Sequence, residues 1–142
     1  MQTTTMIPVE VILLPERCYR CGHTTSPVIG LWFTHDGIDG DDDQMGDDVA
    51  RLFLEYDASS AEIIAAACPD AALDTHGAGP LRWRTTRAMP DGYLANTCHH
   101  CAVVLGNWPL HEAWIEYQAE GGTLDELPRF ASALDEAALQ AL

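Results

Sequence analysis

Two pairs of cysteines carry the strongest chemical signal in the sequence. Cys18 and Cys21 enclose Tyr-Arg, and Cys98 and Cys101 enclose His-His. Two residues between cysteines let both sulfurs point to one side of a tight turn, where backbone N–H groups can donate hydrogen bonds to them. Two such turns facing each other supply four thiolates at the corners of a tetrahedron, with Zn–S bonds of about 2.3 Å. The spacing therefore predicts one structural Zn²⁺ held by all four cysteines.

The distance between the two pairs along the chain decides what such a metal would do. A compact zinc ribbon separates its pairs by about 15–20 residues. Here 76 residues, positions 22–97, lie between Cys21 and Cys98. The metal would be a long-range staple, with most of the chain inserted between its two knuckles. Gly22 after the first pair suits the backbone twist that ends such a turn, whereas Ala102 makes the second half a poorer match.

Other interpretations of the thiols stay open. A redox dithiol lies between a strand and a helix in thioredoxin-like folds, and neither pair here leads directly into a convincing helix. Two unrelated pairs of thiols are a further alternative, and His99 or His100 could replace a cysteine as ligand. We expect these histidines to be exposed on the knuckle and available to a partner. Cys68 follows Ile-Ile-Ala-Ala-Ala, which predicts a buried core residue rather than a regulatory thiol.

The sequence shows no constellation for catalysis. A catalytic zinc needs an open coordination position, and four thiolates leave none. His111-Glu112 lacks the second histidine of a metalloprotease helix, and Gly77–Pro80 lacks the lysine of a phosphate-binding loop. We therefore expect a protein that is not an enzyme.

Four stretches around the cysteines carry a resemblance to known proteins: Cys18–Gly22, Tyr93–Cys101 (Tyr-Leu-Ala-Asn-Thr-Cys-His-His-Cys), Leu105–Asn107 and Leu110–Glu112. They resemble a group of uncharacterised bacterial zinc-ribbon proteins, whose members pair an early Cys-x-x-Cys-Gly and a Val-rich strand with a late Ala-Asn-x-Cys-x-x-Cys and a Gly-Asn or Gly-Asp. The chain departs from that pattern at His99, where Pro is common, and at Ala102, where Gly is common. The resemblance covers the two metal-binding ends of the chain. It implies zinc binding and no established activity.

The charge balance limits the classes of partner. The 142 residues include 22 Asp and Glu against 7 basic residues, all of them Arg, for a formal net charge of −15. A chain this acidic is repelled by phosphate backbones and anionic lipid surfaces, so we expect a protein partner and neither nucleic acid nor membrane. The apolar stretch Ile7–Leu14 contains Pro8 and Glu10 and fails as a signal peptide. This predicts a cytoplasmic protein with reduced thiols.

An acidic, glycine-containing loop over residues 35–48 is one candidate partner surface, with Asp41, Asp42 and Asp43 at its centre. A calcium-binding EF-hand loop beginning at Asp39 would need Gly at position 44 and Glu at position 50. The chain has Gln44 and Ala50, so we expect a solvated loop.

A cluster of arginines is a second candidate. Arg82, Arg84 and Arg87 place three of the seven basic residues in one predicted strand. We expect ion pairs with the chain's own carboxylates, and the functional alternative is contact with an anion or an acidic peptide at Arg82 and Arg84.

Local patterns predict the elements that position these residues. Alternating or β-branched runs predict strands at Val9–Leu14, Val28–Thr34, Leu81–Arg87, Tyr93–Thr97 and Val103–Leu105, the first two joined as a hairpin through the first cysteine turn. Apolar spacing predicts helices at Val49–Tyr56, Ala61–Cys68, Leu110–Glu120 and Leu127–Leu142, with residues 69–80 as a loop. A capping box at Ser59 and Glu62 and a first helical Pro109 would begin two of these helices. The four tryptophans are expected in the core.

Together these patterns predict a single α+β domain over residues 1–142, built as a discontinuous four-cysteine zinc ribbon with β-hairpin knuckles and packed helices. We expect a zinc-binding interaction or adapter protein. The alternatives are a thiol- and zinc-based redox switch, and an acidic inhibitor or DNA mimic that uses the 35–48 loop.

Overall fold

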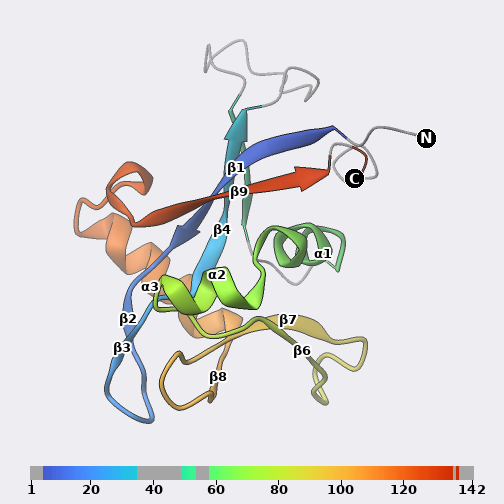
Figure 1. Ribbon diagram of the computed structural model, residues 1–142. Helices are drawn as coiled ribbons and strands as arrows, with labels where there is room; N and C mark the ends of the chain where they lie inside the picture. The colour runs from blue at the N-terminus through green and yellow to red at the C-terminus, as the bar shows by residue number, and fades with distance from the viewer. Residues whose placement is uncertain (1–4, 35–48, 54–57, 136, 138–142) are drawn as a thin grey trace.

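The largest sheet of the protein has four strands and is antiparallel throughout (Figure 1). The structure is a computed structural model that describes residues 5–34, 49–53, 58–135 and 137. The strands lie in the order β5-β4-β1-β9, and their bounds are Val49–Phe53 (β5), Val28–Thr34 (β4), Met6–Leu13 (β1) and Arg129–Asp135 (β9). The first and last strands of the described chain are therefore neighbours in one sheet.

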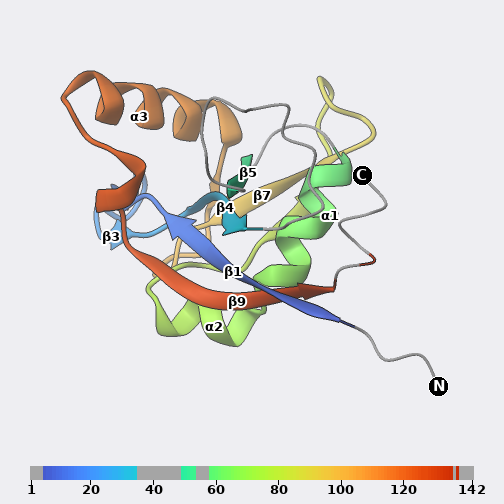
Figure 2. The same ribbon diagram turned by 90° about the horizontal axis from the view of Figure 1, so that it is seen from above.

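Helices cover both faces of this sheet (Figure 2). Alternate residues of β1, among them Val9 and Val11, pack with α1 (Ala58–Ala67) and α2 (Asp70–Thr75) in a first core. Ile12 points to the opposite face and packs with Leu110 of α3 (Asn107–Ala119) in a second core. Successive side chains of a strand point to opposite faces of the sheet. The consecutive apolar residues at the end of β1 therefore contribute to the core on each face. A 3₁₀ helix at Leu124–Glu126 adds to the second core.

Two smaller sheets carry the cysteine turns. The strands β2 (Glu16–Arg17) and β3 (Thr24–Thr25) form an antiparallel hairpin between β1 and β4. The strands β6 (Arg82–Arg84), β7 (Tyr93–Thr97) and β8 (Val104–Leu105) form a second antiparallel sheet. The protein thus combines helices with antiparallel sheets, which confirms the α+β prediction.

Most of the predicted strands are confirmed. The pairing of β1 with β4 is the predicted hairpin, extended at its turn by β2 and β3. Strand β7 occupies the predicted residues, and β6 and β8 lie within the predicted ranges. The helix expected at Ala61–Cys68 exists as α1 but begins at Ala58, so Ser59 lies inside it and cannot be its N-cap. The helix expected at Leu110–Glu120 begins at Asn107, so Pro109 is its third residue.

Two predicted helices are strands, and the predictions are wrong for the same reason. Residues 49–53 form β5 and pair with β4, and residues 129–135 form β9 and pair with β1. Short apolar runs fit the helical and the strand period about equally well. An open edge of the sheet decides between them, because it satisfies the backbone hydrogen bonds of an added strand. Residues 54–56, 136 and 138–142 of the two predictions lie outside the described part of the chain.

Two further expectations are corrected. Residues 69–80, predicted as loop, contain α2, whose N-cap is Pro69 in an extended conformation. Trp83 and Trp108 are 49% and 60% exposed, so neither fills the core, whereas Trp32 and Trp114 are half-buried against the second core. Among the described residues, no helix has the length and apolar character needed to cross a bilayer.

Candidate metal centre

The two cysteine turns have the same backbone design. The N–H of Cys18 donates to the carbonyl of His23 at 2.9 Å, and the N–H of Cys98 donates to the carbonyl of Val103 at 2.9 Å. Within each turn, the residue after the second cysteine donates its N–H back to the first cysteine's carbonyl, both at 3.0 Å, from Gly22 and Ala102. These two residues have left-handed φ angles of 76° and 63°. Ala102 therefore adopts the glycine conformation despite its side chain.

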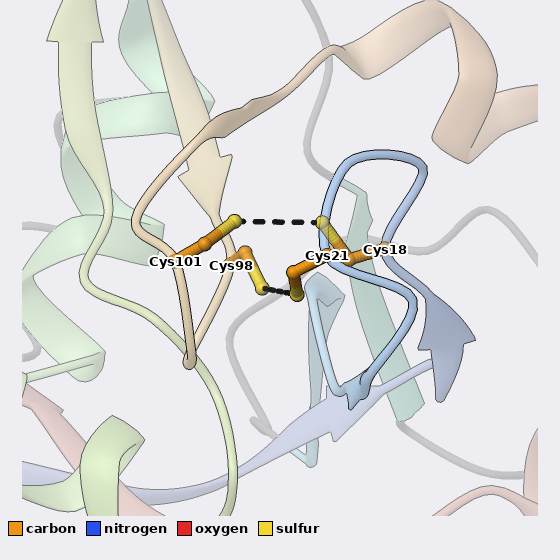
Figure 3. A group of neighbouring side chains, drawn as sticks. All are labelled: Cys18, Cys21, Cys98 and Cys101. Carbon is orange, nitrogen blue, oxygen red and sulfur yellow. Dashed lines mark hydrogen bonds between the residues drawn. The ribbon is translucent and has the colours of Figure 1, made fainter.

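The four sulfurs meet in one cluster (Figure 3). The Sγ atoms of Cys18 and Cys101 are 3.7 Å apart, as are those of Cys21 and Cys98, and all four lie within 4.8 Å of one another. Zn–S bonds of about 2.3 Å place the corners of a tetrahedron about 3.8 Å apart. The cluster therefore fits one tetrahedral ion of that size, and each knuckle contributes two of the four ligands.

Backbone N–H groups donate hydrogen bonds to the sulfur of the first cysteine in each turn, and at Cys18 they favour the ionised form. The N–H of Arg20 donates to the Sγ of Cys18, and the N–H of His100 donates to the Sγ of Cys98, each at 3.4 Å. The backbone N–H of Cys21, followed by that of Arg20, lowers the pKa of Cys18 to about 6. The negative charge of one thiolate opposes the ionisation of a second thiol this close to it. At Cys21 the N–H of His23 lowers the pKa, but burial and the three neighbouring sulfurs outweigh it and raise that pKa to about 11.

The burial and spacing of the four sulfurs are compatible with a cation at their centre. Cys18 and Cys98 are 2% and 1% exposed, while Cys21 and Cys101 are half-buried. Four thiolates in so small a space repel one another strongly unless a positive ion neutralises them. Thiolate ligands select soft or borderline metals such as zinc, and four protein ligands leave a tetrahedral ion no open position.

Buried polar contacts outside the turns align the two knuckles. The side chain of Asn96 in β7 is fully buried and bonds to both backbone groups of Val28, at the start of β4. Thr25 of β3 is also buried, and its Oγ1 accepts a hydrogen bond from the N–H of His99 at 3.0 Å. These contacts join residues near the two ends of the long insertion. Sequence patterns do not identify Thr25 or Asn96 as site elements, although Asn96 lies in the Ala-Asn-x-Cys motif.

The histidines of the second knuckle lie outside the metal cluster. His100 is exposed, as predicted, and stacks on His23 with ring centroids 4.5 Å apart. His99, also expected to be exposed, is instead half-buried, and its Nε2 lies 2.9 Å from a carboxylate oxygen of Asp74 at the end of α2. Among the described residues, the metal-compatible cluster contains the four cysteines and neither histidine.

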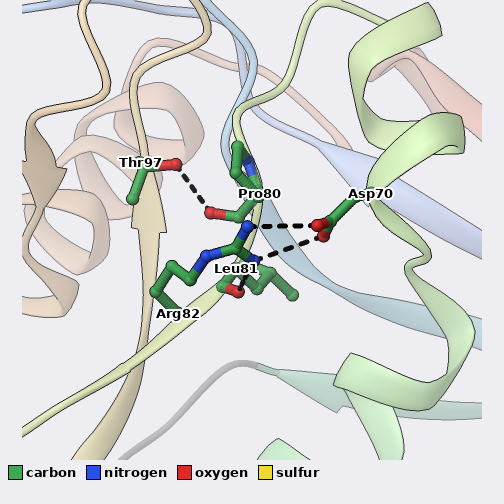
Figure 4. Close-up of polar contacts among 5 residues, drawn as sticks. All are labelled: Asp70, Pro80, Leu81, Arg82 and Thr97. Atoms are coloured by element: carbon green, nitrogen blue, oxygen red, sulfur yellow. Dashed lines mark hydrogen bonds and ion pairs between the residues drawn. The ribbon is translucent and has the colours of Figure 1, made fainter.

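Of the three clustered arginines, one forms an ion pair within the chain and two are exposed. Arg82 pairs with the Asp70 carboxylate through both terminal nitrogens, at 3.1 and 3.4 Å, as expected for an ion pair within the chain (Figure 4). Nearby, the Oγ1 of Thr97 donates to the carbonyl of Pro80 at 2.6 Å and fixes the segment before β6 against β7. Arg84 and Arg87 are exposed and form no ion pair with any residue that the structure describes.

The remaining candidates do not extend the site. Asp41, Asp42 and Asp43, with the whole 35–48 loop, lie outside the described residues. Cys68 is buried in the first core, as predicted, and burial raises its pKa to about 12. It is therefore a packed thiol, separate from the four clustered cysteines.

Comparison with known proteins gives no relative from which a role could be taken. No protein-family model matches the chain, and neither the curated proteins nor the solved structures give a significant match. The four cysteines, drawn together from two distant turns, are the main chemical feature of the described residues.

Proposed function

We propose that the protein binds one structural Zn²⁺ through Cys18, Cys21, Cys98 and Cys101 and acts as a non-enzymatic interaction module. The observation that carries the metal assignment is the sulfur geometry, with two 3.7 Å contacts between knuckles and all four atoms within 4.8 Å. The shared turn design and the N–H···S bonds support it, since both hold the sulfur atoms in place before the metal arrives. The resemblance to the bacterial zinc-ribbon group belongs to the same proposal.

The proposed role of the metal is to close the fold. Zinc-finger peptides gain on the order of 10–16 kcal/mol from such a site, and a link between distant residues restricts the unfolded chain most. With its coordination complete, the ion would activate no water. The exposed knuckle surface, including Tyr19 and His100, would then be free to contact a partner protein.

Metal content and coordination test this proposal directly. The purified protein should contain one zinc per chain by elemental analysis, and X-ray absorption should show four sulfur neighbours at about 2.3 Å. Cys18→Ser and Cys101→Ser should lose zinc, whereas Cys68→Ala, which also removes one thiol, should keep it. Zinc bound with nitrogen or oxygen neighbours would contradict the four-cysteine site.

The non-enzymatic part of the proposal has its own test. We expect no turnover that depends on a single side chain outside the four cysteines. An activity that survives purification and is abolished by one such substitution would contradict it.

A further inference from the structure

A small apolar pocket lies beside the first knuckle, between β2, the end of β8 and the first turns of α3. It has a volume of about 140 Å³. Its apolar wall is formed by Pro27, Leu105, Pro109, Leu110 and Ala113. The pocket is large enough for one aliphatic side chain, and such sites commonly accept the anchor residue of a partner.

One exposed aromatic residue lines the pocket, and another is the sequence neighbour of Pro109. Tyr19 lines the pocket and is 75% exposed, and its hydroxyl donates to the carbonyl of Val104 at 3.2 Å. Trp108, next to Pro109 in the first turn of α3, is 60% exposed. Aromatic side chains this exposed are enriched where proteins bind one another. Because Tyr19 lies between two of the proposed zinc ligands, the metal would fix this side of the pocket.

The charge around the pocket indicates the chemistry of its partner. Glu16 lines the pocket, and no described residue forms an ion pair with it. The carboxylate of Glu116 on α3 lies near that of Glu16. Helix α3, which carries Glu116, contains no Lys or Arg. Arg17 also lines the pocket and is exposed, but the carboxylates outnumber it.

We propose that this pocket binds an aliphatic side chain of a partner protein, from a segment that carries Lys or Arg beside that side chain. The apolar wall receives the aliphatic group, and the carboxylates of Glu16 and Glu116 receive the cation. A second copy of this chain fits the pocket less well, because each copy carries a net charge of −15. The inference rests on the proposed function, since it names the kind of partner that the module would bind.

Model peptides separate the apolar from the electrostatic contribution. The probe is a fluorescein-labelled Lys-Lys-Leu-Lys-Lys peptide, compared with Lys-Lys-Ser-Lys-Lys and Glu-Glu-Leu-Glu-Glu, with binding followed by anisotropy and amide chemical shifts. Burying the leucine should give the first peptide about tenfold tighter binding than the serine peptide, with shifts at Tyr19, Leu105 and Ala113. Equal binding of the leucine and serine peptides would overturn the proposal, because it would indicate charge attraction alone.

Matched variants locate the binding surface. Ala113→Trp fills the pocket and should remove the leucine preference, whereas Ala119→Trp, exposed farther along the same helix, should retain it. Glu16→Gln combined with Glu116→Gln should weaken both lysine peptides severalfold, and Glu62→Gln on α1 should not. The charge variants leave the apolar wall unchanged, so they test the proposal even if Ala113→Trp fails to fold. Unchanged peptide binding in the double Gln variant would overturn the assignment of the carboxylates.

Two further measurements separate the possible failures. Zinc content is determined for every sample, so a zinc-loaded protein that does not distinguish the peptides contradicts this inference alone. A chain without zinc contradicts the proposed function first. Sedimentation of the wild type should show a monomer, and a dimer that Ala113→Trp disrupts would assign the pocket to a second copy and overturn the proposal.

Discussion

The side chain of Asn96 pairs with the backbone of Val28 as a neighbouring strand would. Its Oδ1 accepts from the Val28 N–H at 2.8 Å, and its Nδ2 donates to the Val28 carbonyl at 2.9 Å. The contact is fully buried and lies two residues before Cys98. It therefore holds the strand that leads into the second knuckle against the strand that leaves the first.

Replacing Asn96 with Asp tests this contact with almost no change in shape. A carboxylate cannot donate to the Val28 carbonyl, and its charge would be buried beside that oxygen. We expect the free energy of unfolding to fall by about 3 kcal/mol, with weaker zinc retention against a chelator. Urea denaturation and zinc release measure both effects. Gln118→Glu, the same amide-to-acid change at an exposed site, is the control and should have little effect on the free energy of unfolding. An effect at Asn96 as small as that of the control would contradict the role of this contact.

The left-handed residues of the two knuckles predict opposite effects of reciprocal substitutions. Ala102 has a φ of 63°, where a side chain costs about 1 kcal/mol. Ala102→Gly should therefore raise the free energy of unfolding of the zinc-loaded protein by up to that amount. Gly22→Ala should lower it by about as much, because a Cβ there would have open space and only the backbone conformation would suffer.

The control for this pair is Ala88→Gly, at an exposed residue outside the left-handed region. It should be neutral or destabilising, since glycine gains freedom in the unfolded chain. Denaturation curves at a fixed zinc concentration give the comparison. If Ala102→Gly gave no more stability than Ala88→Gly, the two knuckles would not share their backbone conformation in solution.

The thiols should react in two separate groups. The zinc-loaded native protein should show no rapidly reacting thiol, since four of the five cysteines would ligate the metal and Cys68 is buried with its pKa raised to about 12. Removing zinc under native conditions should expose four thiols, and denaturation should expose the fifth. Titration with a colorimetric thiol reagent counts them at each step. Rapid zinc release by mild peroxide would instead favour the redox switch.

Glu16 predicts a dependence of stability on pH. Its pKa is raised above the ordinary value of 4.5, first by burial and then by Glu116. The folded state holds this proton more tightly than the unfolded state, so its contribution to stability is present at low pH and is lost as pH rises through the folded-state pKa. Glu16→Gln should therefore stabilise the protein at neutral pH relative to acid. Partial solvent exposure limits the gain to below about 1 kcal/mol.

Thermal or urea unfolding across the pH range measures this effect as the difference between variant and wild type, because loss of metal in acid affects both alike. Glu62→Gln, exposed on α1, controls for the removal of one negative charge. A gain that is the same at every pH would contradict the assignment to Glu16.

The sequence predicted which four cysteines would form the cluster, because the chemistry of each cysteine turn is local. Two residues between cysteines define a tight turn wherever the turn lies, and the Gly22 conformation follows from the same motif. The strands β4 and β7 were predictable because their apolar runs lie between turn residues. Helix α2 was missed because it is only six residues long, between breakers.

Tertiary structure decided the rest. Residues 49–53 and 129–135 carry apolar spacings that suit a helix or a strand, and they became β5 and β9 because the sheet offered them edges with unpaired backbone groups. The meeting of Cys18 with Cys101 across the long insertion depends on buried contacts such as Asn96 with Val28. A short motif determines the shape of a turn through interactions between residues that are close in the sequence. The place of that turn beside another is fixed by packing and hydrogen bonds between residues far apart in the chain.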